Sequence, residues 1–315
     1  MFQEVACIGA GVIGKSWAVS YALKEVSVRL YVRNPEKKDS TMAEIREMFQ
    51  DLVSCEVLKP EQVDQCMTHI HIYHDLSQVL DGISFIQESL PEKIEIKHEF
   101  LKSVDQYAPA DAIVASSTSG LSIREIAKGS VHPERVIGGH PFNPPHLLPL
   151  VEMTALDPEC AALKAAYDFY KAVGKEPVIL KKESMGFIGN RLSYALYREA
   201  IDLVVRGVAS IEDVDKAVAY GPGFRWALFG PFATYNLGSP NGIGEMEKKY
   251  GKTLKYVLQD MASWVDVPDE YPEMVQDGVD AEIANFSDAI GHSRDDMIHF
   301  RNKGLITLLK LHGKL

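Results

Sequence analysis

The chain has 315 residues, of which 46% are hydrophobic and 24% are charged, as in an ordinary soluble globular protein. Its formal net charge of −11 argues against nucleic-acid partners, which require a basic surface. No apolar stretch approaches the roughly 18 residues of a membrane span, and we expect no targeting segment before the first strand. We therefore expect a cytoplasmic protein without a membrane partner. The four cysteines lack C-x-x-C pairing, which indicates reduced thiols and no structural zinc (Cys7, Cys55, Cys66 and Cys160).

The first predicted element is a short apolar strand over residues 4–8, followed by Gly9-Ala10-Gly11-Val12-Ile13-Gly14 and a helix. Strand, G-x-G-x-x-G and helix in this order are typical of a dinucleotide-binding turn. Gly9 allows the tight turn, Gly11 lets a pyrophosphate approach the backbone, and Gly14 lets the helix pack on the strand. The helix start, at Val12 and Ile13, then presents its amides and positive dipole to the phosphates.

A second strand is predicted over residues 26–32, and an NAD-binding fold usually has an acid at its end for the ribose 2′-hydroxyl. Here the chain reads Val32-Arg33-Asn34-Pro35 and then Glu36-Lys37-Lys38, so the acid is absent. Arg33, supported by either lysine, suits the 2′-phosphate of NADP. The alternative is a solvated basic turn with the ribose held by Asn34, and Glu36 would restore NAD binding if it reached the ribose.

Residues 36–67 have helical periodicity and, after their first lysines, an acidic character. The histidines that follow, at positions 69, 71 and 74, lack a third ligand, so no metal is expected. A strand over residues 112–115 delivers Ser116-Ser117-Thr118-Ser119 to a carboxyl edge, where ligands bind in an open α/β sheet. Alternatively, these hydroxyls cap the helix that begins near Ser122.

The segment Gly138-Gly139-His140-Pro141-Phe142-Asn143-Pro144 is followed at position 152 by a glutamate. Pro144 and Pro145 break any helix, so we predict a strand ending at His140, a turn, and a strand over residues 148–153 that returns Glu152 alongside. A neutral imidazole whose tautomer is fixed by a carboxylate is a general base near neutral pH. The alternative is a histidine with an ordinary structural role at a strand end.

Strands and helices alternate up to residue 180, which predicts an α/β domain with a doubly wound, mostly parallel Rossmann sheet. From Gly186 helical periodicity dominates, which predicts a second, all-helical C-terminal domain. We expect a dinucleotide-binding domain over residues 1–183 and a helical substrate-binding and dimerisation domain over residues 184–315. The helical part has more apolar sequence than a lid over one site needs, which favours a homodimer.

Four separate motifs occur in order: Gly9–Gly14 with Ser16-Trp17-Ala18, His140–Pro144, Val151-Glu152, and Gly186-Phe187-Ile188-Gly189-Asn190-Arg191. With these motifs the chain resembles the 3-hydroxyacyl-CoA dehydrogenase superfamily over its whole length. Gly223-Phe224-Arg225-Trp226-Ala227 with Gly230-Pro231 is most similar to its lambda-crystallin, L-gulonate 3-dehydrogenase and L-carnitine dehydrogenase branch.

The resemblance implies that His140 is the catalytic base and Glu152 its orienting partner. Ser119, Asn143 and Asn190 would contact the substrate oxygen or the nicotinamide. Two further residues, Glu92 and Lys97, fall where the family contacts the cofactor. The family's acid after the second strand falls on Val32, which is the departure that directs the cofactor prediction towards NADP.

We therefore expect an NAD(P)-dependent dehydrogenase that transfers hydride between the nicotinamide and the 3-hydroxyl or 3-oxo carbon of a small hydroxy acid. Arg225 is the candidate for binding a free substrate carboxylate, unless it is a surface or helix-capping arginine. The alternative function is a 3-hydroxyacyl-CoA dehydrogenase acting on CoA thioesters, against which the acidic segment 36–67 argues. Because the branch includes lens structural proteins, a non-enzymatic role is a further alternative.

Overall fold

The structure is a computed structural model that describes residues 2–315, apart from the side chains of Glu247 and Glu273. The chain forms two compact units. One contains the residues up to Ile188 together with Arg301–Leu315, and the other contains Gly189–Phe300.

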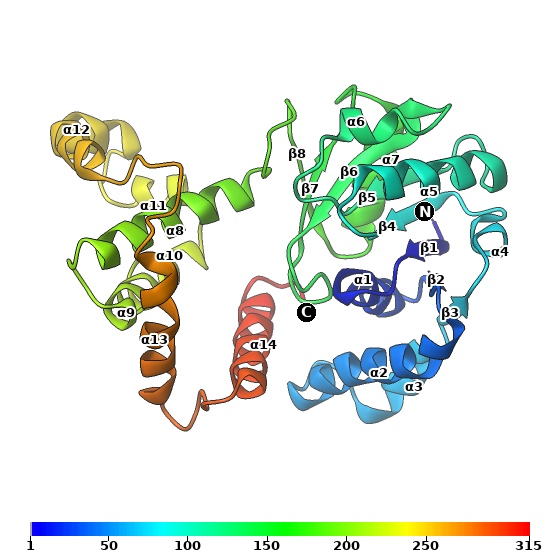
Figure 1. Cartoon of the computed structure of the whole chain (residues 1–315), viewed down its shortest axis with the longest axis horizontal. Helices are drawn as coiled ribbons and strands as arrows, with labels where there is room; N and C mark the ends of the chain where they lie inside the picture. The colour runs from blue at the N-terminus through cyan, green and yellow to red at the C-terminus, as the bar shows by residue number, and fades with distance from the viewer. Residues whose placement is uncertain (1) are drawn as a thin grey trace. The chain divides into compact units, whose positions relative to one another are not determined.

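The first unit is built on an eight-stranded sheet in the order β3-β2-β1-β4-β5-β6-β7-β8 (Figure 1). Neighbouring strands are parallel except at β6 and β7, which are antiparallel. This arrangement confirms the predicted doubly wound, mostly parallel Rossmann sheet, with its order reversing between β1 and β4. The strands are β1 (Glu4–Ile8), β2 (Ser27–Tyr31), β3 (Ile70–Tyr73), β4 (Phe85–Glu88), β5 (Ile113–Ser116), β6 (Val136–Pro141), β7 (Leu150–Thr154) and β8 (Glu176–Ile179).

Two hydrophobic clusters cover the two faces of this sheet. In β1, Val5 and Cys7 belong to one cluster and Ala6 and Ile8 to the other, since successive side chains of a strand point to opposite faces. The first cluster contains side chains of α1 (Val12–Ala22), α2 (Lys38–Ser54), α3 (Pro60–Met67) and α7 (Ala161–Ala172). The second contains side chains of α4 (Leu76–Leu80), α5 (Ile94–Tyr107) and α6 (Ile123–Ala127). Two short 3-10 turns complete the unit, at Pro35–Lys37 and Pro133–Arg135.

The end of the last helix, α14 (Arg294–Leu311), belongs to the sheet unit. Ile306 is buried in the first hydrophobic cluster, and the Asn302 side-chain amide donates to Asp51 of α2 at 3.3 Å. We expected all of residues 184–315 in the helical domain, but residues 184–188 and 301–315 belong to the sheet unit. Apolar residues at helical spacing do not reveal which core the last helix joins.

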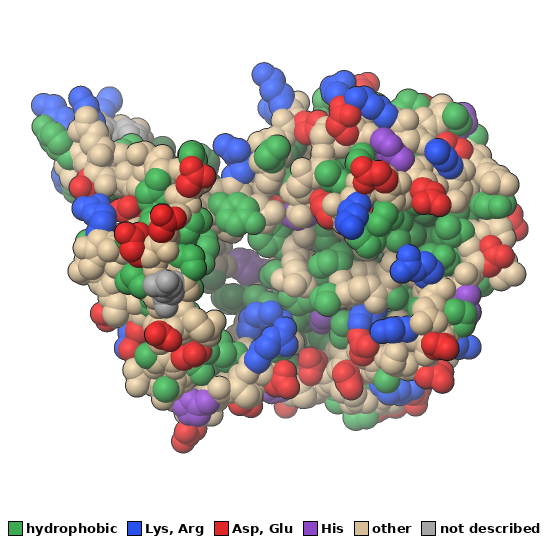
Figure 2. All heavy atoms as spheres, in the orientation of Figure 1, with side chains coloured by type: hydrophobic (Ala, Val, Ile, Leu, Met, Phe, Trp, Pro, Cys, Tyr) green, Lys and Arg blue, Asp and Glu red, His purple; other side chains and the backbone are tan. Residues whose placement is uncertain are grey.

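The second unit is helical, as predicted (Figure 1). Its helices are α8 (Gly189–Val205), α9 (Ile211–Tyr220), α10 (Pro222–Trp226), α11 (Pro231–Asn236), α12 (Ile243–Asp260), α13 (Tyr271–Ala284) and the first part of α14. Many large apolar side chains are exposed on this unit, including Phe224, Phe229, Phe232 and Tyr235. On the face shown in Figure 2, lysine and arginine side chains are interspersed with acidic ones. Within residues 2–315, no helix is long and apolar enough to cross a membrane.

Candidate active site

The glycine turn between β1 and α1 is shaped by close backbone contacts. A Cβ on Gly9, which has φ of +103°, would lie 2.7 Å from the Ser89 carbonyl oxygen, and one on Gly14 would lie 1.7 Å from the Gly9 oxygen. A side chain at either position would therefore displace backbone. A Cβ on Gly11 would meet nothing within 4 Å, so open space lies over the N-cap of α1. This space, beside Val12 and Ile13 at the helix start, fits the pyrophosphate of a dinucleotide.

The end of β2 lacks an acid, and its residues differ strongly in exposure. Val32 is 4% exposed and packs in the first hydrophobic cluster, whereas Arg33 is exposed. The Asn34 side chain accepts a hydrogen bond from the Glu36 amide at 3.1 Å and caps the 3-10 turn over Pro35–Lys37. Asn34 is thus engaged in its own turn, and Arg33 is the exposed cation at this position.

His140 and Glu152 lie directly opposite each other on β6 and β7. The His140 Nδ1 and Glu152 Oε2 atoms are 3.0 Å apart, and the two residues are 5% and 1% exposed. Strand, turn and returning strand have the register predicted from the two prolines. In the neutral tautomer with its hydrogen on Nδ1, the imidazole donates to this carboxylate, and Nε2 is then the ring nitrogen that can accept a proton.

The segment between the sheet and α8 closes over this pair. The Phe187 ring is stacked on the His140 imidazole, with centroids 4.6 Å apart and planes inclined by 18°. The Ile188 amide donates to Glu152 Oε1 at 2.7 Å, so the carboxylate is fixed from two directions. One pocket is lined by residues 119–122 and 183–187, which brings Ser119 and Phe187 to the same opening.

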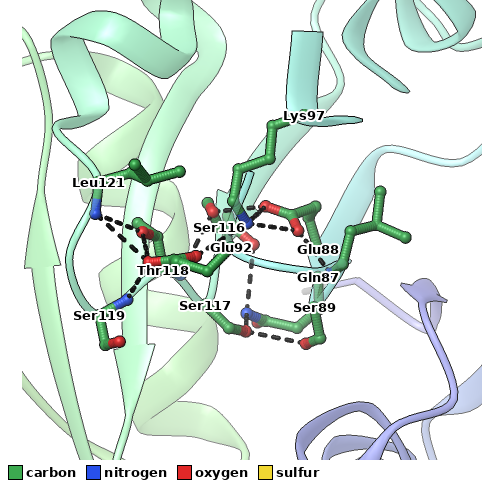
Figure 3. Close-up of polar contacts among 12 residues, drawn as sticks. Gln87, Glu88, Ser89, Glu92, Lys97, Ser116, Ser117, Thr118, Ser119 and Leu121 are labelled. Carbon is green, nitrogen blue, oxygen red and sulfur yellow. Dashed lines mark hydrogen bonds and ion pairs between the residues drawn. The ribbon is translucent and has the colours of Figure 1, made fainter. Parts of the chain in front are cut away.

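Ser119 belongs to a turn held by the carboxylate of Glu92 (Figure 3). Oε1 of Glu92 accepts from the Thr118 hydroxyl at 2.5 Å and from the amides of Ser119, Gly120 and Leu121 at 3.0, 2.9 and 3.3 Å. Burial alone would raise the pKa of Glu92. The Thr118 and backbone hydrogen bonds, together with the Lys97 charge, hold that pKa below its usual value.

Lys97 is 1% exposed, and its ammonium bonds two carboxylates behind this turn (Figure 3). The Nζ atom lies 2.8 and 2.9 Å from the Glu88 oxygens and 3.4 Å from Glu92 Oε2. Ser116 also donates to Glu88, at 2.5 Å. The network therefore connects β4 and β5 to the turn that carries Ser119. These two ion pairs make Lys97 an internal counter-charge to the carboxylates of Glu88 and Glu92.

The remaining predicted residues lie in different parts of the chain. Asn143 is exposed in the loop between β6 and β7, close in sequence to His140. Asn190 is the second residue of the long helix α8, and Arg225 is exposed in α10, so both belong to the helical unit. No group of three histidine, cysteine, aspartate or glutamate side chains that could hold a metal is found within the described part of the chain.

Gln87 connects the hydroxyl turn to the strand of His140, and sequence reasoning missed it. Its Oε1 accepts from the hydroxyls of Tyr21 and Tyr170 at 3.0 and 2.7 Å. Its amide nitrogen donates to Ser117 Oγ at 3.0 Å and to the Gly139 carbonyl at 3.4 Å. A glutamine in an apolar strand was the available signal, because a buried amide requires several partners.

A dinucleotide turn, a buried histidine–carboxylate pair and a hydroxyl turn on one sheet unit define a nicotinamide-dependent oxidoreductase. Residues 4–184 match the family described as 3-hydroxyacyl-CoA dehydrogenase, NAD binding domain. Residues 186–273 match the 3-hydroxyacyl-CoA dehydrogenase C-terminal domain. The chain belongs to the 3-hydroxyacyl-CoA dehydrogenase family and is an NAD-dependent dehydrogenase.

Individual relatives agree with this family. An L-carnitine dehydrogenase of Streptomyces coelicolor is 33% identical, over 99% of this chain and 96% of its own. A 3-hydroxyacyl-CoA dehydrogenase of Gibberella moniliformis is 36% identical, over 80% of this chain and 79% of its own. Among solved structures, an NAD+-dependent pyridine-carboxylic acid 5-dehydrogenase matches with a TM-score of 0.80 and 26% identity, over 99% and 98% of the two chains.

Proposed function

We propose that this protein oxidises the 3-hydroxyl group of a small free hydroxy acid with NAD or NADP, and that L-carnitine is the first substrate to test. The observation that carries the proposal is the buried His140–Glu152 pair on the same unit as the glycine turn. Support for the substrate class comes from L-carnitine dehydrogenases that are about one-third identical over almost the whole chain, as with the Streptomyces relative at 33%.

In this proposal His140 is the general base. Its Nε2 removes the hydroxyl proton, and Glu152 stabilises the imidazolium through the 3.0 Å contact at Nδ1. The glycine turn at Gly9, Gly11 and Gly14 would hold the nicotinamide cofactor, which would supply the hydride acceptor for the carbinol carbon. Ser119 and Asn190 would donate to the substrate oxygen, and Asn143 would contact the nicotinamide. The stacked Phe187 ring would exclude water from one face of the base.

The helical unit supplies groups that suit a substrate with both charges of carnitine. Its exposed Arg225 could form a bidentate pair with a carboxylate. Aromatic faces attract quaternary ammonium groups, and exposed aromatic residues occur near Arg225 in the sequence, within residues 224–235 (Phe224, Trp226, Phe229, Phe232 and Tyr235). We propose that this unit, Gly189–Phe300, provides the substrate-binding part of the enzyme.

Oxidation of CoA thioesters is the second candidate function, because a 3-hydroxyacyl-CoA dehydrogenase is among the relatives. Acidic residues of α2 and α3 and of the connection between them weigh against it, since CoA carries several phosphates (Glu44, Glu47, Asp51, Glu56, Glu61 and Asp64). The test is a panel of L-carnitine, other free 3-hydroxy acids and 3-hydroxyacyl-CoA thioesters, each with NAD and NADP. Turnover of thioesters alone would overturn the free-acid proposal.

Arg225→Met provides a second discrimination. A charge-assisted bond to a substrate carboxylate is worth roughly 1.5–3 kcal/mol, so the KM for the free acid should rise by about one to two orders of magnitude relative to its methyl ester. Equal effects on the acid and the ester would leave Arg225 with a structural role.

We also propose that the enzyme accepts NADP and prefers it to NAD. The support is local: Val32 is buried where the family has an acid, and the exposed Arg33 is followed by Lys37 and Lys38. A guanidinium can form two hydrogen bonds to a 2′-phosphate. Arg33→Ala should weaken NADP by about one to two orders of magnitude and leave NAD nearly unchanged. Tenfold tighter binding of NAD than of NADP by the wild type would refute this preference.

A homodimer formed through the helical unit is our proposal for the oligomeric state. The unit has exposed apolar residues on several helices, among them Leu192, Tyr194 and Leu196 on α8 and Leu254, Val257 and Leu258 on α12. So many exposed apolar side chains are typical of a surface that is covered in the assembled protein. Light scattering of the purified protein at micromolar concentration tests this, and a fully active monomer would contradict it.

A further inference from the structure

The loop between β6 and β7, residues 142–149, is attached to α1 at His146. The His146 amide donates to the Ser16 hydroxyl oxygen at 2.9 Å, and the same oxygen lies 2.7 Å from His146 Nδ1. Ser16 is fully buried, two residues after Gly14 in α1. Because the hydroxyl accepts from the amide, its own hydrogen is available for Nδ1.

This pair of bonds requires a neutral His146 with its hydrogen on Nε2. Burial, with Lys175 and Arg301 nearby, lowers the pKa of His146 to about 4. The imidazole is thus neutral at physiological pH, and Nδ1 is an acceptor. Nε2 is buried without a hydrogen-bond partner among the described residues, so the Ser16 side of the ring alone fixes its orientation.

Lys175 is a second attachment of the same loop. Its ammonium donates to the Pro145 carbonyl and lies over the Trp17 ring, 5.2 Å from the centroid. Lys175 is 6% exposed, and burial together with the Lys24 charge lowers its pKa to about 7. Two adjacent loop residues are therefore linked to two adjacent residues of α1. His146 is hydrogen-bonded directly to Ser16, and Pro145 is linked to Trp17 through Lys175.

Building on the proposed function, we propose that Ser16, His146 and Lys175 are positioning residues that fix the β6–β7 loop to the dinucleotide-binding helix. The N-terminus of α1 would receive the pyrophosphate over Gly11, and its next turn would hold the loop that presents Asn143 to the nicotinamide. The pyrophosphate and the nicotinamide would thus both be located relative to one helix. Hydride transfer depends on such alignment, since a displacement of about 1 Å can cost a factor of ~10² in rate.

Ser16→Ala tests this arrangement. We expect kcat to fall by about ten- to a hundredfold, while the NAD dissociation constant, measured by titration, changes less than threefold. The matched control is Ser20→Ala, which removes a buried hydroxyl from the following turn of α1 and should leave kcat within twofold. If kcat fell equally in both variants, the loss would reflect the removal of any buried hydroxyl from α1 and not the bond to His146. That result would overturn the proposal.

Two further comparisons separate positioning from a general loss of structure. In an Asn143→Ala background, Ser16→Ala should cause little additional loss of kcat, because the loop acts through Asn143. If Ser16→Ala lowered kcat by the same factor in the Asn143→Ala background as in the wild type, the loop would not act through Asn143. His146→Asn, whose side-chain oxygen can replace Nδ1 as the acceptor, should retain much more activity than His146→Leu, and equal losses would exclude the hydrogen bond as the cause.

A spectroscopic measurement is independent of turnover. In a Trp226→Phe/Trp264→Phe background, Trp17 is the only tryptophan left, and the nearby Lys175 should give its fluorescence a transition near pH 7. We expect the transition to disappear in Lys175→Met and to shift in Ser16→Ala. An unchanged transition in Ser16→Ala would overturn the coupling. If the wild type failed to oxidise any hydroxy acid, this measurement and NAD titration would still test the attachment of the loop.

Discussion

The aromatic ring of Phe187 lies flat on the imidazole of His140, with 4.6 Å between the ring centroids. Phe187 reaches this position with φ of +53°, directly after Gly186 with φ of +76°. A non-glycine residue in the left-handed region costs of order 1–3 kcal/mol and persists where surrounding contacts require it. Here the contacts are the stacked ring and the adjacent Ile188 amide on Glu152.

Removing the base should abolish turnover. His140→Ala eliminates the proton acceptor, and Glu152→Gln removes the charge that stabilises the imidazolium. We expect kcat to fall by ~10²–10⁴-fold in each case, with NAD affinity within a few-fold of the wild type. Steady-state kinetics and cofactor titration on the purified variants are the measurements. Retention of a tenth of wild-type turnover by His140→Ala would remove it from the mechanism.

Substitutions of Phe187 separate the ring from its backbone. Phe187→Ala removes the stacking and keeps the unfavourable φ, whereas Phe187→Gly removes both. We expect similar losses of kcat, about tenfold, because the ring supports the base, and a free energy of unfolding about 1 kcal/mol higher for the glycine variant than for alanine. Denaturant unfolding and kcat measured together check this. A glycine variant no more stable than alanine would argue against strain.

Glu92 should act through Ser119. Glu92→Ala leaves the amides of the turn and the Thr118 hydroxyl without their carboxylate, so we expect a large loss of kcat. In a Ser119→Ala background the further loss should be at most twofold, since the two residues form one unit. Glu92→Gln, which keeps an acceptor oxygen, is the matched control and should be milder. If Glu92→Ala lowered kcat by the same factor in both backgrounds, Glu92 would act independently of Ser119. That result would favour a direct contact of Glu92 with the cofactor, as the family resemblance implies.

Acid should destabilise the protein through His146. Its pKa is lowered from about 6.5 to about 4 in the folded state, so between these values the unfolded chain binds more protons. Stability from this residue is complete above pH 6.5 and is lost as the pH falls to 4, by up to about 3 kcal/mol. Urea unfolding at pH 7 and pH 4.5 measures it. His146→Asn should lose less stability over this interval, and an identical pH dependence would contradict the assignment.

Local sequence patterns were sufficient to predict those parts of the site whose residues lie close together along the chain. The glycine turn follows from strand, glycines and helix, and the register of His140 on Glu152 follows from two prolines between two apolar segments. The sheet class followed from alternation of strands and helices. Each of these depends on steric rules that act over a few residues.

Contacts between distant segments could not be predicted in the same way. Ser16 and His146 are 130 residues apart, and the burial of Lys97 between two carboxylates depends on how α5 packs on the sheet. The attachment of residues 301–315 to the sheet unit has the same origin. Polar residues at such positions have no periodic signal, since their partners are set by the tertiary fold.

The antiparallel pairing of β6 with β7 has a consequence for the order in which the site forms. His140 and Glu152 are joined by a closed loop of 12 residues, whereas Ser16 and His146 close one of 130. The entropy of loop closure differs between them by about 2 kcal/mol. A partly denatured molecule would therefore keep its proton-transfer pair assembled after it had lost the alignment of the cofactor, and on refolding the chain would regain that pair before it regained activity.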